Sequence, residues 1–310
     1  MLAGRRKTTA AALLAAAFVL SGCGIAASYR PADSVTIRDV DGRNAYRKRI
    51  GVIALANTTM FTSDQIADPF MQSFLASMTA EGGDVIWVLP GGSDAPPFLS
   101  DPPRAAIGEM DVYTLSALAR QGGMNAVVSP VLMDIRVRSR NAGFWFFKEV
   151  THSLQIQTAA ALYDAITGAR LDLKILTDEV EIDEQDAQIV RNAQEVQVNE
   201  LVDMAEKMGA QLGQRMGDAI DRSNWQASVV SVEQTGCVIS AGREAGIEVD
   251  DRFVVLGLSG VITGLDNQRF IVPGTKIGEL TITRVDDRGS FGVPVSGDPP
   301  PVGSIVMPVD

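Results

Sequence analysis

Between Arg49 and Asp221 the spacing of apolar residues alternates between a pattern typical of β-strands and a pattern typical of α-helices. Residues 50–56 form a nearly continuous apolar run, which is typical of a central β-strand. Apolar residues at four-residue spacing follow, so we expect a helix that starts after Ser63 and stops at the glycines 82–83. The apolar face of this helix comprises Ile66, Phe70, Phe74 and Met78.

The same alternation continues to the end of this region. Further strands are predicted over residues 84–89, 126–137, 154–162 and 171–182. Helices are predicted over about 111–121 and over a long segment that ends near Asp221. The resulting order, β-α-β-α-β-β-β-α, predicts a mixed α-β sheet domain over residues 48–223.

After Trp225 the apolar runs become short, are separated by glycines and lack the helical period. These runs comprise residues 227–232, 237–240, 252–256, 277–283, 290–295 and 304–307. Such spacing predicts a small all-β, barrel-like domain over residues 224–310.

The amino terminus has the three parts of a bacterial export signal. Basic residues 5–7 precede an apolar run over residues 10–20, and small residues lead to Cys23. The run is shorter than the roughly 20 apolar residues that span a bilayer. The motif Leu-Ser-Gly-Cys over residues 20–23 resembles the lipobox of bacterial lipoproteins. This resemblance implies a signal peptide over residues 1–22 and acylation of Cys23, with palmitate among the acyl chains.

The lipobox resemblance also implies a location. Gly24 follows the cysteine, whereas an aspartate there would indicate retention in the inner membrane. We therefore expect an outer-membrane protein that is lipid-anchored through Cys23 and faces the periplasm. Residues 23–47 contain Pro31, Gly42 and scattered charges with little periodicity, which predicts a lipidated tether. As a flexible coil, such a segment would span roughly 25–30 Å on average.

Composition limits the classes of function. Removing residues 1–22 takes away three basic residues and no acidic ones, so the formal net charge changes from −11 to −14. A body with this charge repels nucleic acid, and we expect no nucleic-acid partner. The 46% of hydrophobic and 21% of charged residues are typical of globular domains. Acylation of Cys23 leaves Cys237 alone, so no intramolecular disulfide is expected.

Residues 161–168, with the sequence Ala-Leu-Tyr-Asp-Ala-Ile-Thr-Gly at the turn between the last two predicted strands, resemble a recurring periplasmic domain. That domain occurs at the amino terminus of the Tol translocation B protein, in the curli-secretion channel lipoprotein, in lipoprotein activators of peptidoglycan synthases and in flagellar assembly protein T. Residues 239–253, 276–280 and 302–306 resemble the carboxy-terminal domain of flagellar assembly protein T. The resemblance implies a periplasmic role and carries no catalytic motif.

Motifs for catalysis are absent from the sequence. It has no phosphate-binding glycine loop, no nucleophile elbow, no His-Glu-x-x-His and no Cys-x-x-Cys. His152 is the only histidine, and we interpret it as a hydrogen-bonded surface or edge residue, with a general base as the alternative. No loop has the Asp-x-Asp-x-Asp-Gly spacing of a calcium site. We therefore expect no enzyme, no catalytic residue, no cofactor and no metal.

Four large apolar residues stand together in the connection between two alternating strands: Phe144, Trp145, Phe146 and Phe147. They cannot all face one core, so some of them are expected to be exposed or covered by a partner. One interpretation is a tip that contacts the membrane or another protomer, since tryptophan favours membrane interfaces. The other is a loop that folds back under its own domain.

The last predicted helix carries two rows of residues at four-residue spacing. One row is apolar and faces the core: Met208, Leu212, Met216 and Ile220. The other row comprises Gly209, Gly213 and Gly217, although each glycine costs a helix roughly 0.5–1 kcal/mol relative to alanine. Because glycine has no side chain, this face of the helix permits close approach of another backbone, either from another protomer or from the domain's own sheet or second helix.

Together these patterns predict a non-enzymatic outer-membrane lipoprotein that is an assembly or adaptor component of an envelope machine of the flagellar, pilus or secretion type. Envelope proteins and further copies of the chain, arranged for example as a ring, are the expected partners. Two alternatives follow from the same resemblances. One is an oligomeric secretion channel of the curli-lipoprotein type, and the other is a lipoprotein activator of a peptidoglycan synthase.

Overall fold

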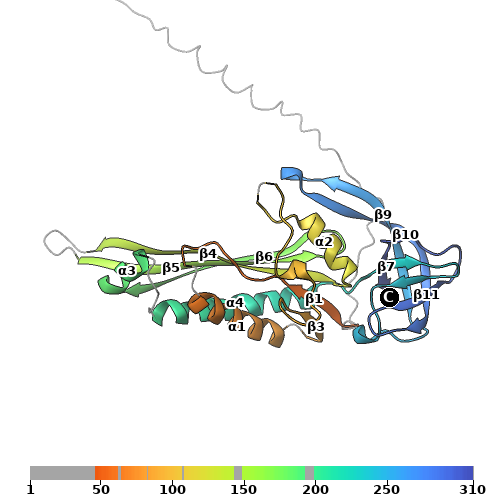
Figure 1. Ribbon diagram of the computed structural model, residues 1–310, viewed down its shortest axis with the longest axis horizontal. Coiled ribbons are helices and arrows are strands. Elements are labelled where there is room, and N and C mark those ends of the chain that lie inside the picture. The colour runs from red at the N-terminus through yellow and green to blue at the C-terminus, as the bar shows by residue number, and fades with distance from the viewer. Residues whose placement is uncertain are drawn as a thin grey trace, which may run out of the picture. The chain divides into compact units, whose positions relative to one another are not determined.

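A computed structural model describes residues 46–61, 64–81, 83–106, 108–142, 149–192 and 199–309 (Figure 1). Its elements follow one another as a mixed α-β region and then a closed β-barrel. The predicted fold class, a mixed sheet domain followed by a small all-β barrel, is therefore confirmed. Among the described residues, no helix is both long enough and apolar enough to cross a membrane.

The sheet of the α-β region has the strand order β3-β1-β4-β5-β6, with β2 paired to β4. β1 pairs in parallel with β3 and β4, whereas β4, β5 and β6 form an antiparallel meander. The bounds are β1 (Lys48–Val52), β2 (Ala56–Asn57), β3 (Val85–Val88), β4 (Ala126–Ala142), β5 (Glu149–Asp164) and β6 (Arg170–Ile182). The predicted single strand over residues 50–56 is wrong, because the chain leaves β1 where Ala54 N donates to Leu99 O (2.7 Å).

Helices cover both faces of this sheet (Figure 1). α1 (Asp64–Glu81) and α4 (Asn199–Arg222) pack on one face, and α2 (Val112–Gln121) packs on the other, beside the short 3-10 helix η1 (Pro97–Leu99). The predicted apolar face of α1 is confirmed, because its buried residues are Ile66, Phe70, Phe74 and Met78. Asp111 caps α2 by accepting a hydrogen bond from Thr114 N (3.1 Å).

A short helix that the sequence pattern does not predict, α3 (Glu184–Arg191), precedes α4. Asp183 caps it by accepting a hydrogen bond from Asp186 N (2.7 Å). Only Ala187 and Val190 of α3 are buried. The observed order therefore contains one helix more than the predicted order.

The six strands after residue 226 close into a barrel with the order β10-β11-β8-β7-β12-β9. Their bounds are β7 (Ala227–Val232), β8 (Cys237–Ile239), β9 (Arg252–Thr263), β10 (Arg269–Val285), β11 (Ser290–Pro294) and β12 (Ile305–Pro308). Two 3-10 turns, η2 (Arg243–Ala245) and η3 (Leu265–Asn267), connect strands. Cys237 lies in the barrel core, where burial raises the pKa of its thiol to about 11 and keeps it protonated at neutral pH.

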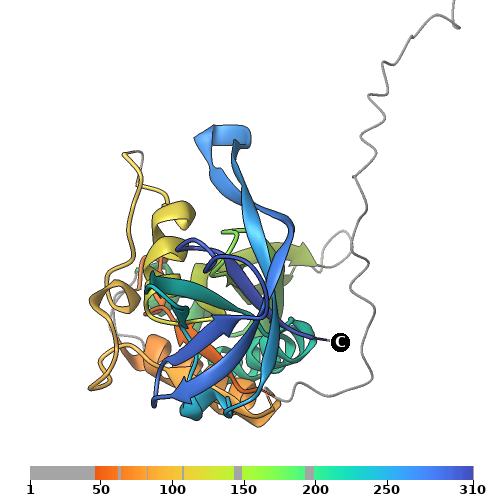
Figure 2. The ribbon, with the colours of Figure 1, turned by 90° about the vertical axis from the view of Figure 1, so that its right-hand side faces the viewer.

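Two barrel strands are longer than the predicted runs over residues 252–256 and 277–283. β9 pairs with β12 over Phe253–Leu256, and β10 pairs with β11 over Leu280–Val285. Residues 257–276 lie beyond these pairings and form a two-stranded extension, which we call the β9–β10 arm. Figure 2 shows the tip of this arm, in light blue, standing clear of the barrel strands.

Candidate functional site

Two predicted contact sites fall outside the residues that the structure describes. The predicted lipidation site, Cys23, precedes the first described residue, Tyr46. The aromatic group Phe144–Phe147 falls between the end of β4 and the start of β5, where residues 143–148 are not described. Both sites stay predictions from the sequence.

The end of the predicted tether is attached to the barrel. The ring of Tyr46 lies 5.0 Å from that of Trp225 and 5.3 Å from that of Phe253, centroid to centroid. The next residue, Arg47, donates its N–H to Ala245 O (2.9 Å) and accepts from Trp225 Nε1 (3.1 Å). Burial, and the nearby carboxylates after it, raise the pKa of Tyr46 to about 12. The segment that leads back to Cys23 therefore starts from a fixed point on the barrel core.

The glycine row of α4 lies inside the α-β region. A Cβ atom on Gly209 would stand 2.4 Å from Phe70 O, and one on Gly213 would stand 2.2 Å from Phe74 O. Both neighbours are backbone atoms of α1, so the two helices approach at a distance that only glycine allows. Gly217 is buried as well. Gly209 and Gly213 thus contact the chain's own first helix.

His152 lies at the centre of a polar cluster that joins β4, β5 and α3. Its Nδ1 atom is 2.8 Å from Ser139 Oγ and 3.1 Å from a guanidinium nitrogen of Arg191, and its Nε2 atom faces the carboxylate of Glu184. The prediction of a surface or edge histidine is wrong, because His152 is buried and β5 lies between β4 and β6. A hydrogen bond from Gln188, followed by the charge of His152, lowers the pKa of the exposed Glu184 carboxyl.

The order serine, histidine, carboxylate invites comparison with a hydrolase triad. Here the guanidinium of Arg191 on α3 contacts both Ser139 Oγ and His152 Nδ1, a contact that such a triad does not have. The cluster therefore fastens α3 to the sheet. Among the described residues, no three His, Cys, Asp or Glu side chains converge as a metal ion would need.

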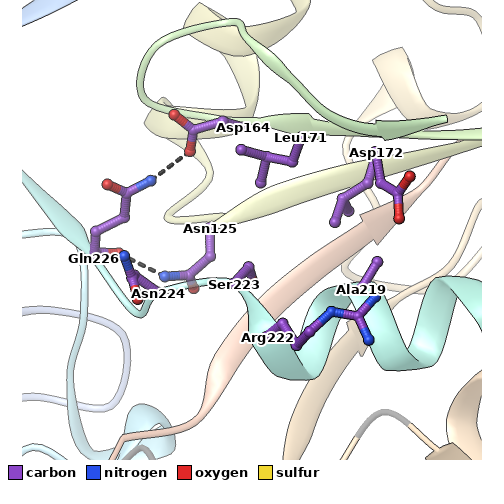
Figure 3. A pocket seen from close by; sticks show the side chains of 10 residues that line it. Asn125, Asp164, Leu171, Asp172, Ala219, Arg222, Ser223, Asn224 and Gln226 are labelled. Atoms are coloured by element: carbon purple, nitrogen blue, oxygen red, sulfur yellow. Dashed lines mark hydrogen bonds between the residues drawn. The ribbon is translucent and has the colours of Figure 1, made fainter. Parts of the chain in front are cut away.

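A pocket of about 390 Å³ opens where β5 and β6 meet the end of α4 and the segment before β7 (Figure 3). Three of its lining residues, Asn125, Asp164 and Gln226, lie close together and are linked by hydrogen bonds. Asn125 Nδ2 donates to Gln226 O (2.6 Å), and Asn125 Oδ1 accepts from Arg49 N (2.8 Å). The polar atoms of Asn125 are therefore occupied by contacts within the chain.

Among these three residues, Asp164 accepts hydrogen bonds from several groups through its carboxylate. Its Oδ2 atom accepts from Thr167 N (2.9 Å) and Thr167 Oγ1 (2.5 Å), and its Oδ1 atom accepts from Gln226 Nε2. It thereby closes the β5–β6 turn and holds the segment that enters the barrel. Both carboxylate oxygens of the buried Asp164 accept hydrogen bonds from within the chain. We therefore assign Asp164 a structural role, in fastening the β5–β6 turn to the segment before β7, rather than a role in binding another molecule.

Replacing Asp164 with alanine is expected to lower the free energy of unfolding by about 1–2 kcal/mol, because the half-buried N–H and O–H donors of Thr167 and Gln226 lose their acceptor. Asp172 in the same pocket is the matched control, since its ion pair with Lys174 (2.9 Å) is partly exposed and its loss should cost less than about 1 kcal/mol. Urea denaturation followed by circular dichroism measures both variants. Equal losses would contradict the fastening role of Asp164.

One face of the sheet carries exposed apolar side chains. On the face opposite α1 and α4, Ser129, Ala161 and Leu173 form one cross-strand row, and Val131, Ala159 and Ile175 form the next. The exposed members of these rows are on β6, where Leu173 is 38% and Ile175 is 51% exposed, whereas Ser129, Ala159 and Ala161 are buried. Further along the same strands this face becomes charged, with Arg136 and Arg138 on β4 opposite Glu179 and Glu181 on β6. We call these rows the open face.

The β9–β10 arm is a second apolar surface, and the sequence pattern did not predict it. Leu265 at its turn is 89% exposed, and Ile262 and Val261 beside it are 56% and 51% exposed. A signal for it exists, because the apolar runs 261–262 and 270–272 flank a short turn that contains glycine, aspartate and asparagine, as in a hairpin. The glycines at positions 257, 260 and 274 and Pro273, which lie on either side of this hairpin turn, interrupt the strand pattern and concealed the arm.

Comparison with known proteins gives a limited result. No protein-family model matches the sequence, and no curated protein matches it. Similar solved structures include the PelC dodecamer from Paraburkholderia phytofirmans, with 13% identity over 55% of this chain and 89% of that chain and a TM-score of 0.32. They also include lipoprotein GNA1162 from Neisseria meningitidis (10% identity, 47% and 94% covered, TM-score 0.28) and a minor lipoprotein from Acinetobacter baumannii (11%, 54% and 94%, 0.27). Likeness at this level assigns neither a fold family nor a function.

Proposed function

We propose that this protein is a non-enzymatic outer-membrane lipoprotein, anchored through Cys23 and facing the periplasm, that assembles with copies of itself as an adaptor component of an envelope machine. The lipobox supports the anchor. The open face carries the proposal of assembly, because its apolar and charged rows fit a second copy of the same face.

The orientation of β6 supports a covered open face. In a sheet with one solvated side, apolar residues normally face the core and polar residues face water. The first half of β6 has the reverse arrangement: Leu173 and Ile175 face outward and are exposed, whereas Asp172 and Lys174 lie on the helix side, less exposed and paired with each other. A strand that presents its apolar side outward gains stability when another surface covers it.

The charges on the open face favour a second copy as the covering surface. Arg138 and Glu181 stand in one cross-strand row, on opposite flanks of Ser153. Within the part of the chain that the structure describes, neither of them forms an ion pair. A two-fold axis parallel to the strands would place Arg138 of each copy over Glu181 of the other, with the apolar rows facing each other. In this arrangement positive side chains face negative ones and apolar rows face apolar rows, so the open face is complementary to a second copy of itself.

Reversing one of these charges is expected to weaken self-association roughly tenfold, because two like-charge pairs replace two opposite pairs across the two-fold interface. The variants are Arg138→Glu and Glu181→Arg, measured as full-length lipidated protein by sedimentation velocity in detergent. Combining both reversals in one chain restores opposite pairs and should restore association. An equimolar mixture of the two single variants should associate as well, in mixed pairs.

Both side chains are exposed, so the thermal unfolding midpoint of each variant serves as the control and should match that of the unaltered protein. A wild-type chain that stays monomeric at micromolar concentration would overturn the proposed assembly. Failure of the doubly reversed chain to recover would overturn the two-fold arrangement.

The two alternatives predict different results. A secretion channel predicts stepwise conductance in planar bilayers, whereas the proposed adaptor predicts none. An activator of a peptidoglycan synthase predicts capture of the synthase by the purified lipoprotein and faster polymerisation. In the structure, the strands expected to line a channel are backed by α3, which packs on both β4 and β5, and this supports the adaptor over the channel.

A further inference from the structure

The tip of the β9–β10 arm presents apolar side chains to solvent with almost no charge around them. Val261, Ile262 and Leu265 are all more than half exposed. Residues 257–268 contain a single charged residue in the sequence, and Arg269, which follows the turn, lies over the Tyr113 ring. A projecting tip of this composition is costly to leave in water and matches a surface that offers hydrocarbon.

The edges of the arm are poorly suited to pairing with a strand of another protein. On β10, Pro273 lacks an N–H donor, and the pairing register shifts on both sides of it. The N–H of Ile271 is already donated to Thr167 O (2.9 Å). On β9, Gly260 has a φ of 142°, which interrupts the extended edge. Bulges and prolines of this kind block strand addition, so the apolar tip rather than the edges is available for contact.

The outer half of the arm is held against the α-β region by contacts from Arg269 and Ile271, which pair with Thr263 and Val261 next to the turn. The guanidinium of Arg269 lies 4.0 Å from the centroid of the Tyr113 ring on α2. Together with the Ile271 hydrogen bond, this contact fixes the arm against α2 and the β5–β6 turn. A fixed arm loses little conformational freedom when its tip is inserted elsewhere, which favours binding.

The predicted tether ends on the same barrel from which the arm extends. Tyr46 packs against Trp225 and Phe253 in the barrel core, and residues 24–45 separate it from Cys23. A coil of that length spans on average roughly 25 Å, and the arm from residue 257 to residue 263 extends about 20 Å. The tether and the arm therefore have similar reach from one body, and a membrane that holds the acyl chains of Cys23 lies within reach of the arm tip.

We propose that the tip of the β9–β10 arm inserts Val261, Ile262 and Leu265 into the lipid interface of the membrane that holds Cys23. This inference rests on the lipid anchor of the proposed function. The expected lipid is zwitterionic, because the strongly negative protein is repelled by an anionic surface and gains its contact from apolar insertion. Two contacts, the acyl chains and the arm tip, would then fix the orientation of the barrel on the membrane.

An environment-sensitive fluorophore tests this contact. The variant Leu265→Cys carries the probe NBD at the tip, and Met60→Cys, an exposed apolar position after β2, is the matched control. Cys237 is buried, so the added cysteine is labelled selectively in acylated protein. The full-length lipidated variants are reconstituted in phosphatidylcholine–phosphatidylethanolamine vesicles with and without spin-labelled lipid. We expect a blue shift and quenching by spin-labelled lipid at position 265, and neither effect at position 60.

Each other outcome decides against the arm contact. A probe at position 265 that iodide quenches from water as fully as the probe at position 60 overturns the proposal. A probe at position 265 that neither quencher reaches is covered by protein, and this also overturns lipid as the occupant. Mass spectrometry of the same preparation shows whether Cys23 is acylated. Acylated protein with a tip in water leaves the anchor standing, whereas unacylated protein overturns the anchor and, with it, the arm contact.

Discussion

Gly213→Ala is expected to lower the free energy of unfolding by about 3 kcal/mol or more, although alanine is the better helix former by roughly 0.5–1 kcal/mol. The added Cβ would stand 2.2 Å from Phe74 O and 3.0 Å from Met78 N. Both atoms belong to the backbone of α1, so no side-chain rotation relieves the contact and α1 and α4 must move apart. Cores packed at crystal-like density do not accommodate such a shift without losing neighbouring contacts. Guanidinium denaturation followed by far-ultraviolet circular dichroism measures the loss.

Gly278→Ala is the matched control for this substitution. Gly278 lies in β10, and no atom stands within 4 Å of the position that its Cβ would occupy. Its replacement should change the free energy of unfolding by less than about 1 kcal/mol. If the glycine row served a contact between protomers, Gly213→Ala would leave the unfolding of the single chain unchanged and would alter only the mass of the assembly. That result would contradict the packing described for α1 and α4.

The elements that the sequence predicts well are those whose apolar period persists for several turns. Phe70 and Phe74 sit in a stripe of four residues, and all four are buried against the sheet and α4. α3 has no such stripe, since only Ala187 and Val190 are buried and acidic side chains dominate its first turn. Its position depends on contacts from His152 and Ser139 to Arg191, which join residues distant in sequence and leave no local period.

The barrel strands show a second reason why apolar patterns predict the ends of elements incorrectly. Within the barrel, buried residues such as Phe253 and Leu280 alternate with less buried neighbours and produce a recognisable strand signal. Beyond the barrel, the same two strands continue through Gly257, Gly260 and Pro273, where Ile271 is the one buried residue among the described side chains. A single buried residue does not set an alternation, so strands predicted from apolar patterns alone end too early.

For the open face, the sequence predicts that a strand is present but not which of its sides faces the helices. The alternation of Leu173 and Ile175 with polar neighbours correctly indicates a strand. The usual rule then assigns the apolar side to the core, whereas in the structure that side is exposed and Lys174 lies on the helix side. Which side of an alternating strand faces the helices is set by its register with β5, and register is a property of the folded sheet.

Stability is expected to rise with pH between about 8 and 10.5 by about 2–3 kcal/mol more in the unaltered protein than in Lys48→Met. Lys48 is buried, and burial lowers the pKa of its ammonium from 10.5 to about 8, although the charge of Asp221 acts in the opposite direction. Its Nζ atom donates to the last carbonyls of α4, Ile220 O (2.7 Å) and Asp221 O (2.9 Å). A neutral amine retains two N–H donors for these two acceptors, so the contacts survive deprotonation.

The direction of this effect follows from proton binding. Between pH 8 and 10.5 the unfolded chain still holds the proton on Lys48, whereas the folded chain has released it, so raising the pH draws the equilibrium toward the folded state. Below pH 8 both states are protonated and the cost of burying the charge is fully present. Tyr46 and Cys237 also titrate in alkaline solution, with pKa values raised to about 12 and about 11. Both are present in both proteins and cancel in the comparison.

Urea denaturation at a series of pH values from 7 to 10.5 measures the difference, with each protein compared with its own value at pH 7. Lys276→Met is the matched control, because Lys276 is exposed and pairs with Glu279 on the surface (2.6 Å). It should keep the alkaline rise of the unaltered protein. If Lys48→Met shows the same rise as well, the buried ammonium is not the group that titrates, and the carbonyls at the end of α4 are held by a lysine whose charge costs the fold little.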